Sequence, residues 1–125
     1  MRVVRVENTT RAVLIGDRIE LAHSSMRRLF GLLGRRGLSA GGGLWISPSS
    51  GIHTMGMAFP IDVIGLDRNR NIVKLWNSLR PFRLTSISFK MKSVLELPAG
   101  TILASGAQLG DTLQITSAGV AKEEE

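Results

Sequence analysis

Apolar residues occur in short runs along the chain, and glycine, proline and polar clusters separate these runs. This pattern is typical of short β-strands joined by turns. The sequence predicts strands at 2–6, 11–15, 19–22, 44–46, 62–67, 72–76, 93–97 and 112–116. A tight hairpin is expected at Ile15-Gly16-Asp17-Arg18, because Gly and Asp tolerate the positive φ of such turns. The segment 77–91 shows no clean period and contains Pro81, which predicts an irregular crossing segment.

The hydrophobic period changes to that of a helix after the first strands. In the segment 25–33 the apolar side chains fall at the spacing of one helix face, which predicts the main helix there. A second, short helix is predicted at about 99–105, since Pro98 is tolerated in a first turn and Gly106 can end it. The predicted fold is α+β and β-rich: a small, partly closed β-barrel of short, mostly antiparallel strands.

Length and composition restrict the class of protein. At 125 residues the chain can form one core, so we expect one globular domain at 1–121 and a disordered acidic tail at 122–125. There is no cysteine, which excludes a disulfide framework, a thiolate zinc site and a cysteine nucleophile. No run approaches the ~20 apolar residues of a transmembrane helix, and the start lacks the apolar stretch of a signal peptide. These features predict a cytoplasmic protein without membrane contact.

The chain is basic, with a formal net charge of +6 at pH 7. Such a body can attract polyanions. Aromatic residues make up only 5% of the chain and tyrosine is absent, so a base-stacking platform is poorly supplied. We therefore do not expect nucleic-acid binding, and polyanion binding through the arginines is the weakest functional alternative.

A central stretch that ends at Asp62 concentrates the residues able to carry chemistry. His53 titrates near neutrality and can act as a general acid or base. Asp62 can orient it, with Ser86, Ser88 or Ser93 as nucleophile. None of these serines lies in a Gly-x-Ser-x-Gly elbow, so the evidence for a catalytic triad is weak.

Both central residues also have structural alternatives. His53 can be a hydrogen-bonded structural residue. Asp62 can cap a turn by accepting backbone N–H bonds, or it can form an ion pair with Arg28 or Arg80. A metal site needs three or four ligands in workable geometry. No metal and no cofactor is predicted, because the only candidate ligands are His23, His53, Asp62 and Asp67.

A set of motifs in a fixed order resembles the signature of a bacterial and archaeal family, domain of unknown function 192. The motifs are Arg28-x-x-Gly31-Leu32-Leu33-Gly34-Arg35, Gly43-Leu44-x-Ile46-x-Pro48, His53-Thr54, Met57, Phe59-Pro60-Ile61-Asp62-Val63, Asp67, Leu79-Arg80-Pro81, Val94-Leu95-Glu96-Leu97-Pro98-Ala99-Gly100 and Gly110-Asp111. The resemblance covers about residues 20–115. It implies a small, β-dominated, barrel-like fold with a helix packed against it, and it implies no established activity.

The chain departs from the family pattern at three places. Gly56 stands where relatives often carry a bulky aromatic or polar side chain, and Gly42 stands where many have an acidic residue. Relatives often place a cysteine near Ser49. Any chemistry carried by those positions in relatives is therefore lost or altered here.

These observations lead to two functional hypotheses. The first is a non-catalytic small-ligand-binding or accessory module, a monomer whose partner is an unidentified small molecule or protein. Its groove is expected to be lined by His53, Thr54, Met57, Asp62 and Arg80. The alternative is a small hydrolase or isomerase that uses His53 with Asp62. Structural roles are expected for Arg28, Gly31, Pro60, Gly110 and Asp111.

Overall fold

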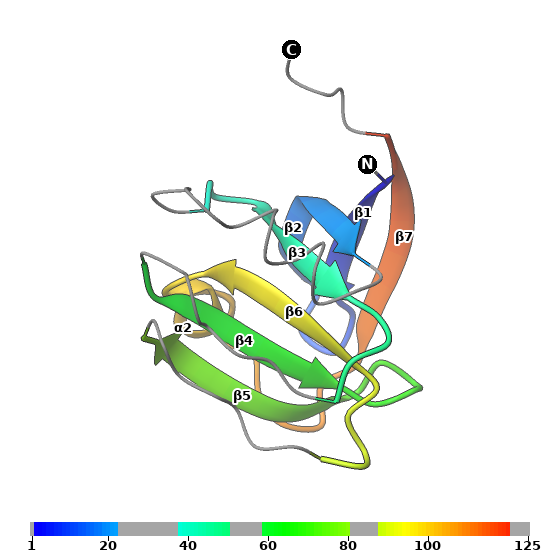
Figure 1. Ribbon diagram of the computed structural model, residues 1–125, viewed down its shortest axis with the longest axis vertical. Coiled ribbons are helices and arrows are strands. Elements are labelled where there is room, and N and C mark those ends of the chain that lie inside the picture. The colour runs from blue at the N-terminus through cyan, green and yellow to red at the C-terminus, as the bar shows by residue number, and fades with distance from the viewer. Residues whose placement is uncertain (1, 23–37, 51–58, 81–87, 121–125) are drawn as a thin grey trace.

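The computed structural model describes residues 2–22, 38–50, 59–80 and 88–120 (Figure 1). This part of the chain forms a seven-stranded sheet and one short helix. The strands are β1 Arg2–Asn8, β2 Val13–Ala22, β3 Gly42–Ile46, β4 Ile61–Leu66, β5 Ile72–Leu79, β6 Ser93–Pro98 and β7 Leu113–Val120. The helix is α2, Thr101–Ser105.

Helix α2 lies where the sequence predicts a short helix, and Gly106 follows it in the left-handed conformation with φ 71°. The N–H groups of Gly106 and Ala107 donate to carbonyls of the helix, which ends it in a tight turn. The main helix predicted at 25–33 lies outside the described residues. No helix within the described ranges is long and apolar enough to cross a membrane.

The sheet is mixed and runs in the order β5-β4-β6-β3-β2-β1-β7. All neighbours pair antiparallel except β2 and β3, which are parallel. The edge strands are β5 and β7, and between them the described chain shows only the isolated bridge Asn71–Thr112. A hydrogen bond from the Leu113 N–H to the Arg70 carbonyl oxygen, 2.9 Å, lies beside this bridge. The structure is thus β-rich as predicted, but the partly closed barrel is not confirmed, because β5 and β7 form no continuous ladder.

The sheet separates two hydrophobic cores, because successive side chains of a strand point to opposite faces. The first core takes residues from all seven strands and from α2, among them Trp45 and Leu95. The second core contains Leu44, Val63 and Val94 on the other face. Strand β4 is buried along its whole length, which explains its continuous apolar sequence.

The hairpin predicted at 15–18 is wrong, since β2 runs through these residues without a break. Gly16 is needed for another reason: a Cβ there would lie 2.8 Å from the carbonyl oxygen of Gly41. That oxygen accepts hydrogen bonds from the N–H groups of Asp17 and Arg18, at 3.1 and 3.0 Å. The glycine therefore allows β2 to lie against the segment before β3, and the chain reverses earlier, between β1 and β2.

Candidate functional site

Part of the site expected from the sequence lies outside the described residues. This applies to His53, Thr54 and Met57 of the predicted groove, and to Arg28 and Gly31. Their roles stay predictions. Arg80 and Pro60 are described, and both are exposed.

Asp62 is fully buried in β4, on the face of the sheet that α2 covers. Its Oδ1 accepts a hydrogen bond from the N–H of Ser78, and its Oδ2 accepts one from the N–H of Ile102, each at 2.8 Å. Ile102 belongs to the first turn of α2, where backbone N–H groups have no partner within the helix. Ser78 has a positive φ of 47°, which this bond helps to hold. Both carboxylate oxygens thus fix backbone, which is the capping role that the sequence suggests for Asp62.

Asp111 is also buried and also has its partners within the chain. Its Oδ2 accepts hydrogen bonds from Arg11 Nε at 2.6 Å, from Asn8 Nδ2 at 2.9 Å and from the N–H of Gln108 at 3.0 Å. The Arg11 hydrogen bond is the main reason that the pKa of Asp111 falls from 3.8 to about 2, against the opposing effect of burial. Gly110, with φ 90°, makes the turn that brings this carboxylate to the end of β1. We call Asn8, Arg11, Gln108 and Asp111 the Asp111 network.

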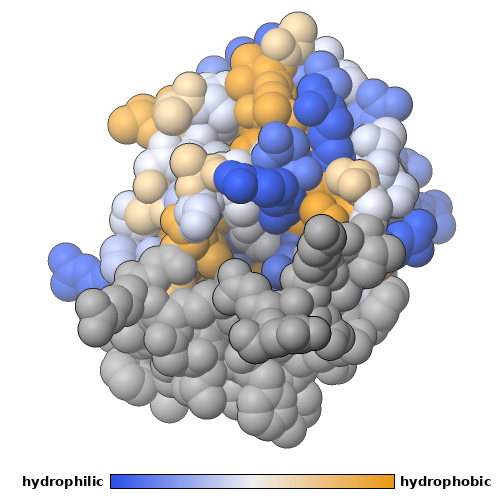
Figure 2. Space-filling view, turned by 90° about the horizontal axis from the view of Figure 1, so that it is seen from above, coloured by the Kyte–Doolittle hydropathy of each residue, from blue (hydrophilic) through white to orange (hydrophobic). Residues whose placement is uncertain are grey.

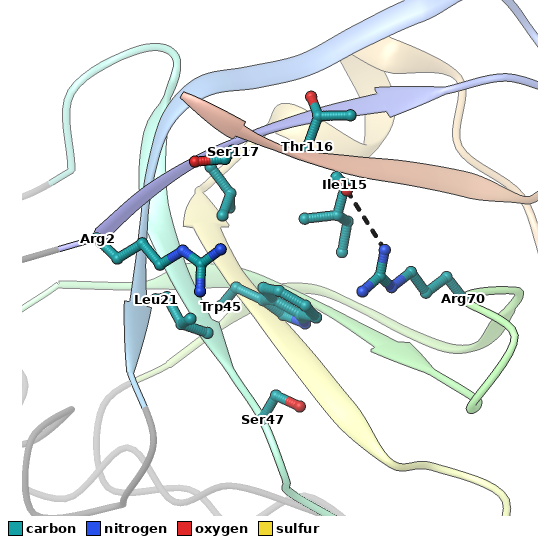
Figure 3. Close-up of a pocket in the computed structure, with 9 residues that line it drawn as sticks. Arg2, Leu21, Trp45, Ser47, Arg70, Ile115, Thr116 and Ser117 are labelled. Atoms are coloured by element: carbon teal, nitrogen blue, oxygen red, sulfur yellow. Dashed lines mark hydrogen bonds between the residues drawn. The ribbon is translucent and has the colours of Figure 1, made fainter. Parts of the chain in front are cut away.

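A cavity of about 260 Å³ opens near the other end of β1 and β7 (Figure 3). The residues that line it come from β1, β2, β3, β7, the position just after β3, and the turn between β4 and β5. They are Arg2, Val4, Leu21, Trp45, Ser47, Arg70, Ile115, Thr116 and Ser117. We call this cavity the Trp45 pocket.

Trp45 forms the floor of the pocket and is held by β3. Gly43, two residues before it, has φ 150°, and a Cβ there would overlap the carbonyl oxygen of Glu96 on the neighbouring strand. The glycine lets β3 lie close to β6 and sets the position of the indole. Trp45 is only 9% exposed, yet its Nε1–H has no hydrogen-bond acceptor in the described chain. An unsatisfied buried donor costs about 1–3 kcal/mol, and nearly all buried donors in proteins have a partner.

Arg70 covers one side of the indole from the turn between β4 and β5. The turn is fixed by Asp67, whose Oδ1 accepts the N–H groups of Asn69 and Asn71, each at 2.9 Å. Arg70 adopts a positive φ of 63° within this turn. Its guanidinium carbon lies 5.0 Å from the centroid of the Trp45 ring, which is a cation–π contact. The same guanidinium donates a hydrogen bond of 3.3 Å to the carbonyl oxygen of Ile115 in β7.

The electrostatic character of the pocket is cationic. Figure 3 shows Arg2 and Arg70 pointing toward Trp45 from opposite sides. None of the nine lining residues is acidic, and neither arginine has a carboxylate partner within the described ranges. Figure 2, which views the molecule from the end where β1 starts, shows hydrophobic and strongly hydrophilic side chains side by side. The arrangement can therefore bind an anion and cover an apolar group beside it.

Sequence reasoning did not select Trp45 or Arg70. The available signals were a single Trp in a short aliphatic strand and an Arg in a polar hairpin turn. Each is ordinary by itself. Only the sheet order, which places β3, β7 and the β4–β5 turn around one space, brings them together.

The chain resembles two solved structures. One is a protein of unknown function from Novosphingobium aromaticivorans, with TM-score 0.74, 22% identity and coverage of 89% of this chain and 82% of that chain. The other is a putative transcription regulator from Sinorhizobium meliloti, with TM-score 0.74, 24% identity and coverage of 95% of each chain. At these identities the likeness shows a common fold.

No curated protein matches the sequence. The family model of DUF192, described as "Uncharacterized ACR", matches residues 4–115 of the 125. This match includes every strand from β2 to β6, most of β1, and the buried residues Asp62 and Asp111. The chain therefore belongs to the DUF192 family.

Proposed function

We propose that the protein is a non-catalytic small-ligand-binding module and that its ligand site is the Trp45 pocket. The observation that carries this proposal is the side chain of Trp45, which lines a cavity of about 260 Å³ and whose buried Nε1–H has no acceptor in the described chain. A bound ligand that supplies an acceptor would satisfy this donor. Concave sites lined by apolar side chains and a few polar groups are the usual form of small-molecule sites.

The lining residues support binding rather than catalysis. Ser47 and Ser117 carry hydroxyl groups, but none of the nine lining residues is His, Asp, Glu, Cys or Lys. A serine nucleophile needs a neighbouring base to accept its proton. The hydrolase or isomerase alternative uses Asp62, whose two oxygens accept backbone N–H bonds from Ser78 and Ile102. A carboxylate held in this way is poorly placed to orient a catalytic histidine.

The place of the pocket on the sheet also suits a ligand site. The first core takes residues from all seven strands, and Trp45 belongs both to that core and to the pocket. The bridge between Asn71 and Thr112 joins the sheet edges close to Arg70. We keep the partly closed barrel as part of this proposal, with the pocket as its mouth. Barrel mouths are frequent ligand sites.

The proposal can be tested by NMR on the two tryptophan indoles of uniformly ¹⁵N-labelled protein. Trp45 reports on the pocket, while Trp76 packs against the second core and serves as the internal control. We expect fragments from a small-molecule library to shift the Trp45 Nε1–H signal saturably and to leave the Trp76 signal in place.

A matched variant makes the result decisive. Trp45→Phe keeps an aromatic ring and removes the N–H donor, so fragments that bind the wild type through that donor should bind the variant more weakly. A library that moves neither indole, or hits that bind Trp45→Phe unchanged, would contradict the proposed site.

A further inference from the structure

We infer that the Trp45 pocket selects small organic carboxylates, in which an anionic group is attached to an apolar body. This inference rests on the proposed function and adds the class of ligand. It follows from the charge of the pocket, from the hydrogen-bond donors of its lining residues, and from its apolar wall.

The charge of the pocket favours an anion. Arg2 and Arg70 approach the indole from opposite sides (Figure 3), and the lining set holds no carboxylate. Two guanidinium groups that share one partly enclosed space repel each other. An anion between them removes this repulsion, whereas a neutral ligand leaves it. A cationic ligand would add to it.

The donors of the pocket fit a carboxylate. Arg70 donates one N–H to the Ile115 carbonyl oxygen. A guanidinium has five N–H groups in a planar fork that matches the geometry of a carboxylate, so further N–H groups remain for a ligand. Arg2 is exposed and has no ion pair within the described chain. The Trp45 Nε1–H offers one further donor without an acceptor. A carboxylate has two oxygens that together accept about four hydrogen bonds, enough for these three groups.

The apolar wall separates an organic carboxylate from an inorganic anion. Val4, Leu21 and Ile115 line the pocket beside the arginines. Phosphate or sulfate would leave these side chains uncovered. A ligand with a hydrocarbon or ring next to its carboxylate would bury them, and apolar burial contributes roughly 25 cal/mol per Å². The cavity volume of about 260 Å³ limits the ligand to a small molecule.

The chain offers a matched control for each pocket arginine. Arg68 lies in the same turn as Arg70, and Arg5 lies in the same strand as Arg2; both are exposed and neither lines the pocket. Each pair of Arg→Gln changes removes the same charge. A difference within a pair therefore reports a contact, while an equal effect reports only the net charge of the protein.

The probes are benzoate, its neutral isostere benzamide, and inorganic phosphate, titrated into the full chain at constant ionic strength. We expect benzoate to shift the Trp45 indole signal saturably, and benzamide and phosphate to bind at least about tenfold more weakly. Arg70→Gln should weaken benzoate binding about tenfold or more, in line with a lost charge-assisted hydrogen bond. Arg2→Gln should weaken it less, because Arg2 is exposed, while Arg68→Gln and Arg5→Gln should bind as the wild type does.

Each contrary outcome has a distinct meaning. Equal binding of benzoate and benzamide would overturn the carboxylate class but leave a small-ligand site. Equal binding of benzoate and phosphate would show an unselective anion site and overturn the organic part of the inference. Equal losses from Arg70→Gln and Arg68→Gln would show attraction to net charge and remove the site. If benzoate and a broad fragment library both fail to move the Trp45 signal, the proposed function fails as well.

Discussion

The two ends of the strand pair β1 and β7 use similar side chains with opposite results. At one end, Asn8 and Arg11 both donate hydrogen bonds to the buried carboxylate of Asp111. At the other end, Arg2 and Arg70 surround Trp45 without any carboxylate among the lining residues. One end contains its own anion, and the other does not.

This difference separates buried polar groups that have partners within the chain from one that has no partner among the described residues. A buried polar group costs free energy unless it is hydrogen-bonded. The Asp111 network avoids that cost within the chain, and the lowered pKa of Asp111, about 2, reflects the strength of its contacts. In the Trp45 pocket the unpartnered indole N–H bears this cost, and under our proposal a bound ligand would remove it. In the pocket a ligand carboxylate would play the part that Asp111 plays in the network.

The largest expected effect on stability comes from removing the carboxylate at the centre of the Asp111 network. Asp111→Ala removes the acceptor of Asn8 Nδ2, Arg11 Nε and the Gln108 N–H at once. Asn8 is fully buried, so its Nδ2–H donor is left without this acceptor. We expect a loss of about 3 kcal/mol in the free energy of unfolding, measured by urea denaturation. The exposed Asp17 gives the control: Asp17→Asn should change stability by less than about 0.5 kcal/mol. A loss below about 1 kcal/mol for Asp111→Ala would contradict the network.

A smaller effect should appear when pH removes the charge of Asp111. Because the folded-state pKa is lowered from 3.8 to about 2, this carboxylate stabilises the fold fully above about pH 5, and the contribution is lost as pH falls through about 4 to 2. The shift corresponds to about 2 kcal/mol. We expect the stability gap between the wild type and Asp111→Asn to shrink by about this amount between pH 7 and pH 2. A gap that does not change with pH would contradict the assigned pKa.

Sequence patterns were sufficient for most of the strands because burial is local information along a strand. The runs around β3, β4 and β6 are continuous and apolar, and each is buried. The prediction of a hairpin at 15–18 was wrong because Gly16 and Asp17 are residue types that are common in turns. The constraint that selects glycine there is the Gly41 carbonyl, which lies 25 positions away along the chain and cannot be read from the local sequence.

The candidate site was less predictable for the same physical reason. Arg2, Trp45, Arg70 and Ser117 come from four separate segments, and only the order of the strands joins them. For Asp62 the sequence left several roles open, among them a backbone cap, and the hydrogen bonds from the N–H groups of Ser78 and Ile102 show the cap. Its actual partner in α2, Ile102, lies 40 residues away and needed the structure. The groove predicted around His53 lies outside the described residues and stays a prediction.

The smallest effect on stability is expected for Trp45→Phe. This change tests directly whether the donor in the Trp45 pocket lacks a partner, in contrast to the donors of the Asp111 network. Replacing a buried aromatic residue normally costs several kcal/mol, about 3–5 for truncation to alanine. Trp45→Phe loses part of the indole volume, but it also removes a buried donor that has no acceptor in the described chain. Removing such a donor is expected to raise the free energy of unfolding by about 1–3 kcal/mol. We expect the two effects nearly to cancel, so that the free energy of unfolding changes by less than about 1 kcal/mol.

Leu95→Ala in the same core provides the reference, with an expected loss of about 2–5 kcal/mol, because Leu95 is fully buried. A loss above about 2 kcal/mol for Trp45→Phe, in protein free of small molecules, would mean that the indole N–H is already satisfied in solution. The two ends of β1 and β7 would then be alike, because neither would contain an unpartnered donor. The main support for a ligand site in the Trp45 pocket would be removed. A near-zero change together with weaker benzoate binding would separate the two roles: this N–H would contribute to binding and not to folding.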